Sequence, residues 1–333
     1  MEAKLTEHSP VGYCLSHSFE LFEQFADATQ DWELDFRQLA AANSPFRLQQ
    51  LSTPRMLAAR AKLDSHFYQR GGPSIGFRSF ALHTNSCSDY QWCGERADPH
   101  SLVVMPEDGQ FESVSRPGFD IFTLSLSTAL LSRTAEVEFE RPLSDFIGPS
   151  GEVCYRVGNA LREIRTVLHS LCETVEKGRD RIAGQYGAAG LTRVERKLAH
   201  LVLSCLERGD KQAPRGPRSK RMLALNRALE VIEHTPPPEL CMPDLVEQTG
   251  ASRRTLEYAF QDSLGLSPAH YIKALKLRAF HKELLAREAR FVSLADLSAQ
   301  HGFTHAGQLA VDYRRMFREL PSATLRRAHQ LHR

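Results

Sequence analysis

Basic side chains in the last third of the chain are the residues whose types and spacing indicate a chemistry. Residues 215–333 hold 19 Lys and Arg against 12 Asp and Glu, a net charge of +7. Residues 1–214 hold 23 against 28, a net charge of −5, so the whole chain of 333 residues sums to only +2. Such an asymmetry is typical of a polyanion-binding module joined to a module of another kind.

Two segments of the basic part share a layout that suits DNA. Each has a short helix, a tight glycine-containing turn and a longer helix: PDLVEQTG-A-SRRTLEYAFQDSLG (243–265) and SLADLSAQHG-F-THAGQLAVDYRRMF (293–317). In this helix-turn-helix layout the second helix can enter the DNA major groove. The predicted helix between them, 268–286, is roughly 28 Å long. Because successive major grooves on one face lie ~34–36 Å apart, one chain could read two adjacent grooves.

The elements that must position these segments are predicted as helices. Apolar residues at helical spacing, with capping residues, predict helices over 222–233, 243–248, 253–264, 268–286, 294–301 and 305–319. The preceding segment 207–221, rich in Pro, Gly and basic residues, contains no large apolar side chain, which indicates a linker. The predicted domains are therefore 1–206 and 222–333.

The N-terminal domain has two patterns of apolar residues. Between residues 44 and 126, short apolar runs separated by turn residues predict strands, clearest at 75–82, 102–105 and 119–126, and hence a small sandwich or barrel. From about residue 152 to 207 the apolar residues recur at helical spacing and predict two amphipathic helices. These helices could cover the barrel or pair with a second subunit, and the sequence leaves both alternatives open.

A longer pattern in the basic part resembles a known family. The runs S-x-x-x-L-x-x-x-F from Ser252 and G-x-S-P-x-x-Y-I from Gly265, then Gly302-Phe303 and a closing Phe317 and Pro321, are similar to the AraC/XylS family of bacterial transcription regulators over about residues 221–327. The resemblance implies an α+β chain with a cupin-like β-rich barrel that senses a ligand, a helical dimerisation segment and a C-terminal all-α double helix-turn-helix domain.

The resemblance also implies which residues face bases. In the first recognition helix they are Arg253, Arg254, Glu257 and Tyr258, and in the second they are His305, Ala306, Gly307, Gln308 and Val311. Arg pairs with guanine and Glu accepts from cytosine N4. The second set departs from the family, which commonly has Ser where Gly307 stands and Arg where Val311 stands. We therefore expect the first unit to carry most base discrimination.

Phosphate contacts are expected from basic and hydroxyl side chains near the two recognition helices. A solvated basic face is the ordinary interpretation of such residues, but the helix-turn-helix context favours DNA. The candidates are Ser252, Lys273, Lys276, Arg278, Arg314, Arg315 and Arg318.

The N-terminal barrel is expected to bind a small molecule in its mouth. Core packing or an exposed charge is the commoner role for each candidate, but Arg78 lies in an otherwise apolar strand and could pair with a ligand carboxylate. The candidate lining residues are Phe67, Tyr68, Arg78, Phe80, Tyr90, Trp92 and Arg96.

Two other classes of N-terminal domain remain as alternatives. A metal-dependent barrel enzyme needs clustered histidines, whereas His66, His83 and His100 are isolated in the sequence. We therefore predict no catalytic residues, no metal and no cofactor. A domain that binds a partner protein instead of a metabolite would explain the same sequence.

The sequence thus predicts a DNA-binding transcription regulator. Its expected partners are double-stranded promoter DNA, a second copy of the chain, a small-molecule effector and, if it is an activator, RNA polymerase; activation is favoured over repression only by the resemblance. No run of ~18 apolar residues and no signal-peptide pattern occurs, so we expect no membrane partner and a cytoplasmic location.

Overall fold

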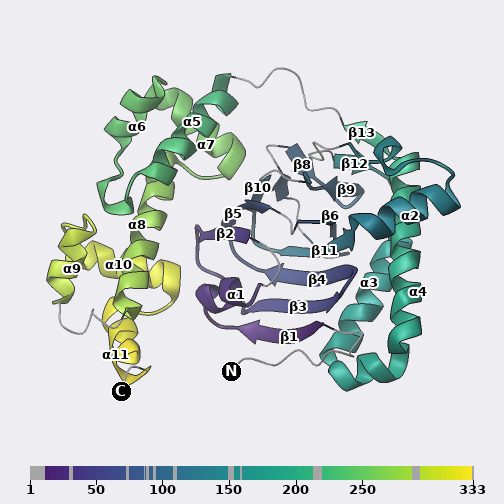
Figure 1. Cartoon of the computed structure of the whole chain (residues 1–333). Coiled ribbons are helices and arrows are strands. Elements are labelled where there is room, and N and C mark those ends of the chain that lie inside the picture. Colours follow the sequence, from purple (N-terminus) through teal and green to yellow (C-terminus); the bar gives the residue numbers. More distant parts are fainter. Residues whose placement is uncertain are drawn as a thin grey trace. The chain divides into compact units, whose positions relative to one another are not determined.

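Strands and helices segregate along the chain. In the computed structural model most strands precede residue 128, and the described residues after 219 form helices (Figure 1). The structure describes residues 12–29, 33–72, 75–85, 87, 90–92, 95–107, 111–148, 154–157, 160–212, 220–286 and 293–331. The chain divides into two units, one of residues 1–36, 43–64 and 69–214, and one of residues 37–42, 65–68 and 215–333.

The β-rich part consists of two sheets. The strands of the larger sheet are, in spatial order, β1 (Tyr13–Phe19), β3 (Phe46–Thr53), β4 (Met56–Leu63), β11 (Phe119–Ser127), β6 (Phe77–His83), β9 (Ser101–Val104), β12 (Cys154–Arg156) and β13 (Asp210–Gln212). Those of the smaller sheet are β2 (Glu33–Gln38), β5 (Phe67–Gly72), β10 (Phe111–Ser115), β7 (Tyr90–Trp92) and β8 (Glu95–Ala97).

The α+β class is confirmed. The sequence predicted a small sandwich or barrel, and the described strands form two sheets that do not close into a barrel. Closure requires every strand to pair on both sides. β13 and β8, each at one end of its sheet, have only three residues, too few for a continuous ladder to another strand. β12 also corrects the predicted start of the helical segment, because residues 154–156 pair with β9 instead of beginning a helix.

Three helices share one hydrophobic core with the larger sheet: α2 (Thr128–Glu138), α3 (Leu161–Glu176) and α4 (Arg179–Arg208). On α3 the buried residues Leu161, Ile164, Leu168, Leu171 and Val175 follow the helical spacing that the sequence analysis used. They belong to the same core as strand residues of the larger sheet, and α3 lies against β1, β3 and β4, so α3 covers part of this sheet. The described residues also include α1 (Phe22–Ala28) and a 3-10 helix at Leu143–Asp145.

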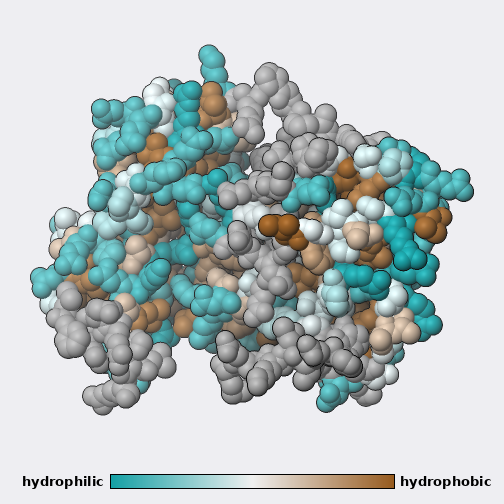
Figure 2. Space-filling view, viewed as in Figure 1, coloured by the Kyte–Doolittle hydropathy of each residue, from teal (hydrophilic) through white to brown (hydrophobic). Residues whose placement is uncertain are grey.

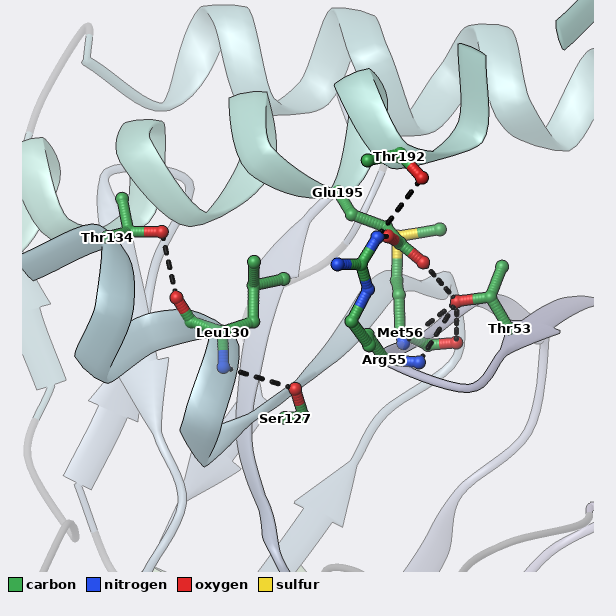
Figure 3. Close-up of polar contacts among 8 residues, drawn as sticks. All are labelled: Thr53, Arg55, Met56, Ser127, Leu130, Thr134, Thr192 and Glu195. Atoms are coloured by element: carbon green, nitrogen blue, oxygen red, sulfur yellow. Dashed lines mark hydrogen bonds and ion pairs between the residues drawn. The ribbon is translucent and has the colours of Figure 1, made fainter. Parts of the chain in front are cut away.

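A buried carboxylate ties the turn between β3 and β4 to α4 (Figure 3). The side chain of Glu195 is 3% exposed and accepts hydrogen bonds from Arg55 Nη2 and from Thr53 Oγ1, each at 2.5 Å. Arg55 also donates to Thr192 Oγ1 at 3.1 Å. Because burying an unpaired charge is costly, this arrangement holds α4 at one position on the strand turn.

The helical part begins with α5 (Lys220–His234) and a 3-10 helix at Pro237–Glu239. The further helices are α6 (Met242–Thr249), α7 (Arg253–Leu264), α8 (Pro268–Leu285), α9 (Leu294–Gln300), α10 (Ala306–Phe317) and α11 (Pro321–Leu331). All six predicted helices are present to within two residues at each end. The sequence analysis named no helix after Pro321, where α11 begins.

Surface polarity agrees with this packing. Among the coloured residues on the face drawn in Figure 2, hydrophilic areas are broad and hydrophobic residues appear in smaller groups between them. Within the described part of the chain, no helix has the length and apolar character that crossing a membrane requires.

Candidate nucleic-acid interface

The first helix-turn-helix is α6, a turn at Gly250, and α7. Gly250 has φ of 64°, the left-handed conformation that ends α6, and the Ser252 hydroxyl caps α7 by accepting from the Thr255 N–H. Leu256 and Phe260 of α7 are buried on the inward face of this helix. These caps and apolar contacts fix where α7 begins and which face it turns outward.

The outward face of α7 carries the four predicted base-facing residues, Arg253, Arg254, Glu257 and Tyr258, all exposed. They pair along the helix: Arg253 Nε donates to Glu257 Oε1 at 3.0 Å, and Arg254 Nη2 donates to the Tyr258 hydroxyl at 3.2 Å. An exposed i,i+4 pair contributes well under ~1 kcal/mol. These side chains can therefore exchange their partners for base edges at little cost.

Sequence reasoning missed one cation beside this face. The guanidinium of Arg221, on α5, lies 4.8 Å from the Tyr258 ring centroid and donates to Asp262 Oδ2 at 2.7 Å. The sequence around Arg221 does not indicate this contact, because Arg221 and its partners on α7 are distant in sequence. Arg221 therefore links α5 to α7 through Tyr258 and Asp262.

The second helix-turn-helix is α9, a turn at Gly302, and α10. The Ser293 hydroxyl caps α9 by accepting from the Asp296 N–H. Gly302 has φ of 75°, and a Cβ there would lie 3.2 Å from Lys276 Nζ and 3.5 Å from the Pro238 carbonyl oxygen. The conformation at this turn therefore favours glycine, and a Cβ there would also press on the end of the Lys276 side chain.

The predicted base-facing residues of α10 also share an exposed face: His305, Ala306, Gly307, Gln308 and Val311. Leu309, Tyr313 and Met316 are buried on the opposite face. Val311 is 55% exposed and Tyr258 is 42% exposed, which places two of the exposed large apolar side chains on the recognition helices. Exposed apolar groups at such positions can meet a thymine methyl.

Asp312 joins α10 to α8. Its Oδ2 accepts from Gln308 Nε2 at 3.1 Å and from Lys273 Nζ at 3.2 Å. Partial burial pushes the pKa of the Asp312 carboxyl upward, but the hydrogen bonds from Gln308 and Lys273 outweigh it and lower that pKa. The carboxylate thus orients the amide of Gln308 and engages the amine of Lys273.

The other candidate phosphate contacts lie in different settings. Arg314, Arg315 and Arg318 are exposed at the C-terminal end of α10, where Arg318 has φ of 63° and ends the helix. Lys276 lies over the Gly302 turn, and Arg278 is half-buried on α8. The structure therefore places Arg314 and Arg315 on one exposed helix end, whereas the three candidate cations of α8 are only partly exposed.

A buried polar chain beneath α10 was not found from the sequence. His281 Nδ1 lies 2.5 Å from the Tyr313 hydroxyl, which lies 2.7 Å from Thr324 Oγ1. Burial lowers the pKa of His281 to about 4, with further lowering by the charges of Arg327 and Arg278. His281 is therefore neutral at pH 7 and acts in packing. Its place beside Phe280 on the apolar part of α8 is the sequence feature that could have predicted the burial of His281.

The candidate effector residues of the β-rich part lie mostly in the core. Phe67, Tyr68, Phe80, Tyr90 and Trp92 are each at most 2% exposed. Arg78 is 3% exposed and donates to Glu107 Oε2 at 2.8 Å and to the Gly148 carbonyl at 3.0 Å, whereas Arg96 is exposed. Arg78 therefore already has a carboxylate partner in the chain itself.

A cavity between strand residues of both sheets contains one of these seven candidates, Trp92. Its other lining residues include Phe25, Gln50, Gln69 and Phe111, and its volume is about 50 Å³. A cavity of ~150 Å³ admits benzene. The cavity as it stands holds water-sized contents only. Among the described residues no group of three His, Cys, Asp or Glu side chains is placed to hold a metal ion.

Known proteins resemble this chain in the helical part and beyond it. A helix-turn-helix domain family model matches residues 245–327. A protein of Pseudomonas putida named XylDLEGF operon transcriptional activator 1 is 30% identical over 232 residues, which cover 68% of this chain and 67% of that protein. The probable thc operon regulatory protein of Rhodococcus erythropolis is 28% identical over 99 residues, 30% of each chain.

Other curated relatives are matched over a smaller share of their length. A second Pseudomonas putida protein of the same name is 31% identical over 138 residues, which cover 41% of this chain and 42% of that protein. Over most such relatives the likeness is therefore confined to less than half of each protein.

Solved structures give a weaker likeness. The AraC-like transcriptional activator CuxR has a TM-score of 0.40 and 14% identity, covering 81% of this chain and 96% of that one. ToxT from Vibrio cholerae O395 has a TM-score of 0.27 and 9% identity, covering 89% and 98%. Such scores support no residue-by-residue correspondence. The 30% identity over two thirds of both chains does show kinship, and the chain belongs to the AraC/XylS family of transcription regulators.

Proposed function

We propose that this chain is a regulator that binds double-stranded promoter DNA in a sequence-specific manner, with α7 and α10 entering two major grooves. The observation that carries the proposal is the pair of exposed recognition faces on α7 and α10, each opposite a buried apolar face of the same helix. The net charge of +7 over residues 215–333 supplies the attraction to phosphates.

The two recognition helices have unequal chemistry for reading bases. On α7, Arg253 and Arg254 can pair with guanine and Glu257 can accept from cytosine. On α10, Gln308 can pair with adenine and Val311 can contact a thymine methyl, while Ala306 and Gly307 offer no hydrogen-bonding side chain. We therefore assign most base discrimination to α7, with α10 supplying one or two base contacts and shape.

An operator selection tests this proposal. Random DNA duplexes are selected with the full chain and sequenced, and the information content of the two half-sites is compared. We expect a bipartite site whose α7 half carries more information, and Arg253→Ala should relax one position of that half. Selection of no sequence at all contradicts the proposal, and equal information in both halves contradicts the assignment to α7.

Control of transcription adds further partners. We infer that the chain acts in the cytoplasm as a homodimer, that its β-rich part binds a small-molecule effector, and that it activates transcription through RNA polymerase. The relatives' names as operon transcriptional activators support activation. An effector would act through a coupling free energy between its site and the DNA site. Sedimentation of the chain at micromolar concentrations tests the dimer, and promoter-reporter output with and without the gene tests the sign of control.

A further inference from the structure

A polar groove lies between the larger sheet and α3 in the β-rich part. Its volume is about 680 Å³, within the ~300–1,000 Å³ range of small-molecule sites. The α3 side contributes side chains one turn apart, from Arg162 through Arg165 and His169 to Glu173. The opposite side consists of Arg60, Thr84, Asn85, Pro99, His100 and Phe122.

The groove walls are held by arginine hydrogen bonds. Arg60 donates through Nε and Nη2 to both carboxylate oxygens of Asp120, at 2.8 and 2.7 Å, and Asp120 is 1% exposed. Arg165 donates through Nε to the His83 carbonyl at 2.8 Å and through Nη2 to the Pro99 carbonyl. These contacts fix a strand of the sheet and the turn before β9 relative to α3, so the groove is preorganised.

The cations in the groove are not balanced by carboxylates. Arg60 is neutralised by Asp120, and Glu173 lies 3.3 Å from His169 Nδ1. Arg165 has only carbonyl oxygens as partners within the described part of the chain, and Arg162 is exposed with no ion pair to a described residue. Two of the five N–H donors of Arg165 are used, and burial lowers the pKa of its guanidinium because its charge is poorly solvated there.

We propose that this groove binds a small organic anion, whose carboxylate or phosphate pairs with Arg162 and Arg165 while its carbon skeleton lies against Pro99 and Phe122. A bound oxyanion would supply the counter-charge that the two guanidinium groups lack, through charge-assisted hydrogen bonds. Thr166, Ser170 and Asn85 line the same groove and offer hydroxyl and amide groups to such a ligand. The inference rests on the proposed effector binding by the β-rich part, for which it names a site and a ligand class, and it does not depend on DNA binding.

Titration of the full chain with two anions and one uncharged compound tests the site. The side-chain NMR signals of arginine are followed at pH 6 as phenyl phosphate or phenylacetate is added, with benzyl alcohol as the uncharged probe. We expect saturable shifts of Arg162 and Arg165 with at least one anion and none with benzyl alcohol. Comparing the two anions shows whether the groove prefers a phosphate or a carboxylate group.

Matched variants locate the binding. Arg162→Gln removes a cation that holds no described contact, so the fold should be retained and the affinity should fall about tenfold or more. Arg133→Gln, at an exposed arginine of α2 outside the groove, should leave the affinity unchanged. Equal shifts at Arg133 and Arg162, or no shift with either anion at millimolar concentration, would overturn the proposal. If the chain binds no DNA, the proposed function fails while this titration remains readable.

Discussion

Lys273 of α8 and Asp312 of α10 form an ion pair with 3.2 Å between Nζ and Oδ2, and the same carboxylate oxygen accepts from Gln308. The Lys273 side chain is 41% exposed and that of Asp312 is 11% exposed. A residue expected to contact phosphate thus has a competing partner on the recognition helix itself, and the partner also orients a side chain expected to read a base.

Replacing Asp312 should alter DNA binding in two opposite ways. Asp312→Asn removes the charge that engages Lys273, so Lys273 becomes free to meet a phosphate and the salt slope of log K should steepen by ~0.9. The base preference at the position read by Gln308 should fall, by up to about 1 kcal/mol, because its amide is less well oriented. Fluorescence anisotropy at several salt concentrations measures both. Glu230→Gln, which removes an exposed charge on α5, serves as the control; an Asp312→Asn slope equal to that of the control contradicts the assignment.

Arg315 should contribute to affinity without contributing to sequence preference. Arg315→Ala is expected to reduce the magnitude of the salt slope by ~0.9 and to weaken binding to all sequences alike. The measurement compares the selected operator with a scrambled duplex across a salt series. A loss confined to the operator would mean that Arg315 reads bases instead.

Neutral, buried His281 should make the fold sensitive to acid. Its folded pKa of about 4 lies below its ordinary value of 6.5, so the unfolded chain takes up the proton first as the pH falls. The stability that neutral His281 allows is therefore present above about pH 6.5 and is lost between 6.5 and 4. We expect a loss of about 2 kcal/mol at pH 5 relative to pH 8.

Urea unfolding at the two pH values checks this expectation. His281→Phe keeps a ring that can stack on Phe317 and removes the titrating group, so its stability should change less with pH than that of the unaltered chain. His305→Gln, at an exposed position, provides the comparison and should retain the full pH dependence. An unchanged pH dependence in His281→Phe would assign the effect to another group.

Two glycines of the second helix-turn-helix should respond oppositely to alanine. Gly302→Ala places a Cβ at positive φ and against Lys276, and should destabilise the chain by about 1–2 kcal/mol. Gly307 lies inside α10 with open space at its Cβ position, so Gly307→Ala should stabilise it by up to about 1 kcal/mol. Chemical denaturation of both variants tests the pair, and a common sign of the two effects would refute this account.

Glu195 should stabilise the β-rich part through its contacts with Thr53 and Arg55. Glu195→Ala leaves a polar cavity and removes the carboxylate that Thr53 and Arg55 contact. We expect the free energy of unfolding to fall by about 2–3 kcal/mol. The loss is no larger because Arg55 is half-exposed and can regain water. Glu195→Gln keeps a side chain of the same size and should lose less. Denaturation of the full chain is the measurement, with Glu136→Gln, at an exposed site on α2, as the control. Equal stability of Glu195→Ala and the control would show that the buried contacts contribute nothing.

The helical part was predictable from sequence because its signals are local. The hydroxyls of Ser252, Ser267 and Ser293 cap the predicted helices that follow them, and Gly250 and Gly265 end helices in the left-handed conformation. A cap and the helix that it serves lie within four residues of each other, so neighbouring sequence determines both. The exposed faces of α7 and α10 then follow from the helical period.

Tertiary structure decided what depends on residues distant in sequence. β4, with the sequence MLAARAKL, consists of residues that favour helices, yet it pairs with β3 on one side and β11 on the other, and these two ladders outweigh its local propensity. Contacts between residues distant in sequence also create the Asp312–Lys273 pair, the His281–Tyr313 contact and the groove that contains Arg162 and Arg165. Sequence determined which helices form and where their polar faces lie; only the folded chain decided which charges are paired and which remain available, because pairing is set by packing between elements.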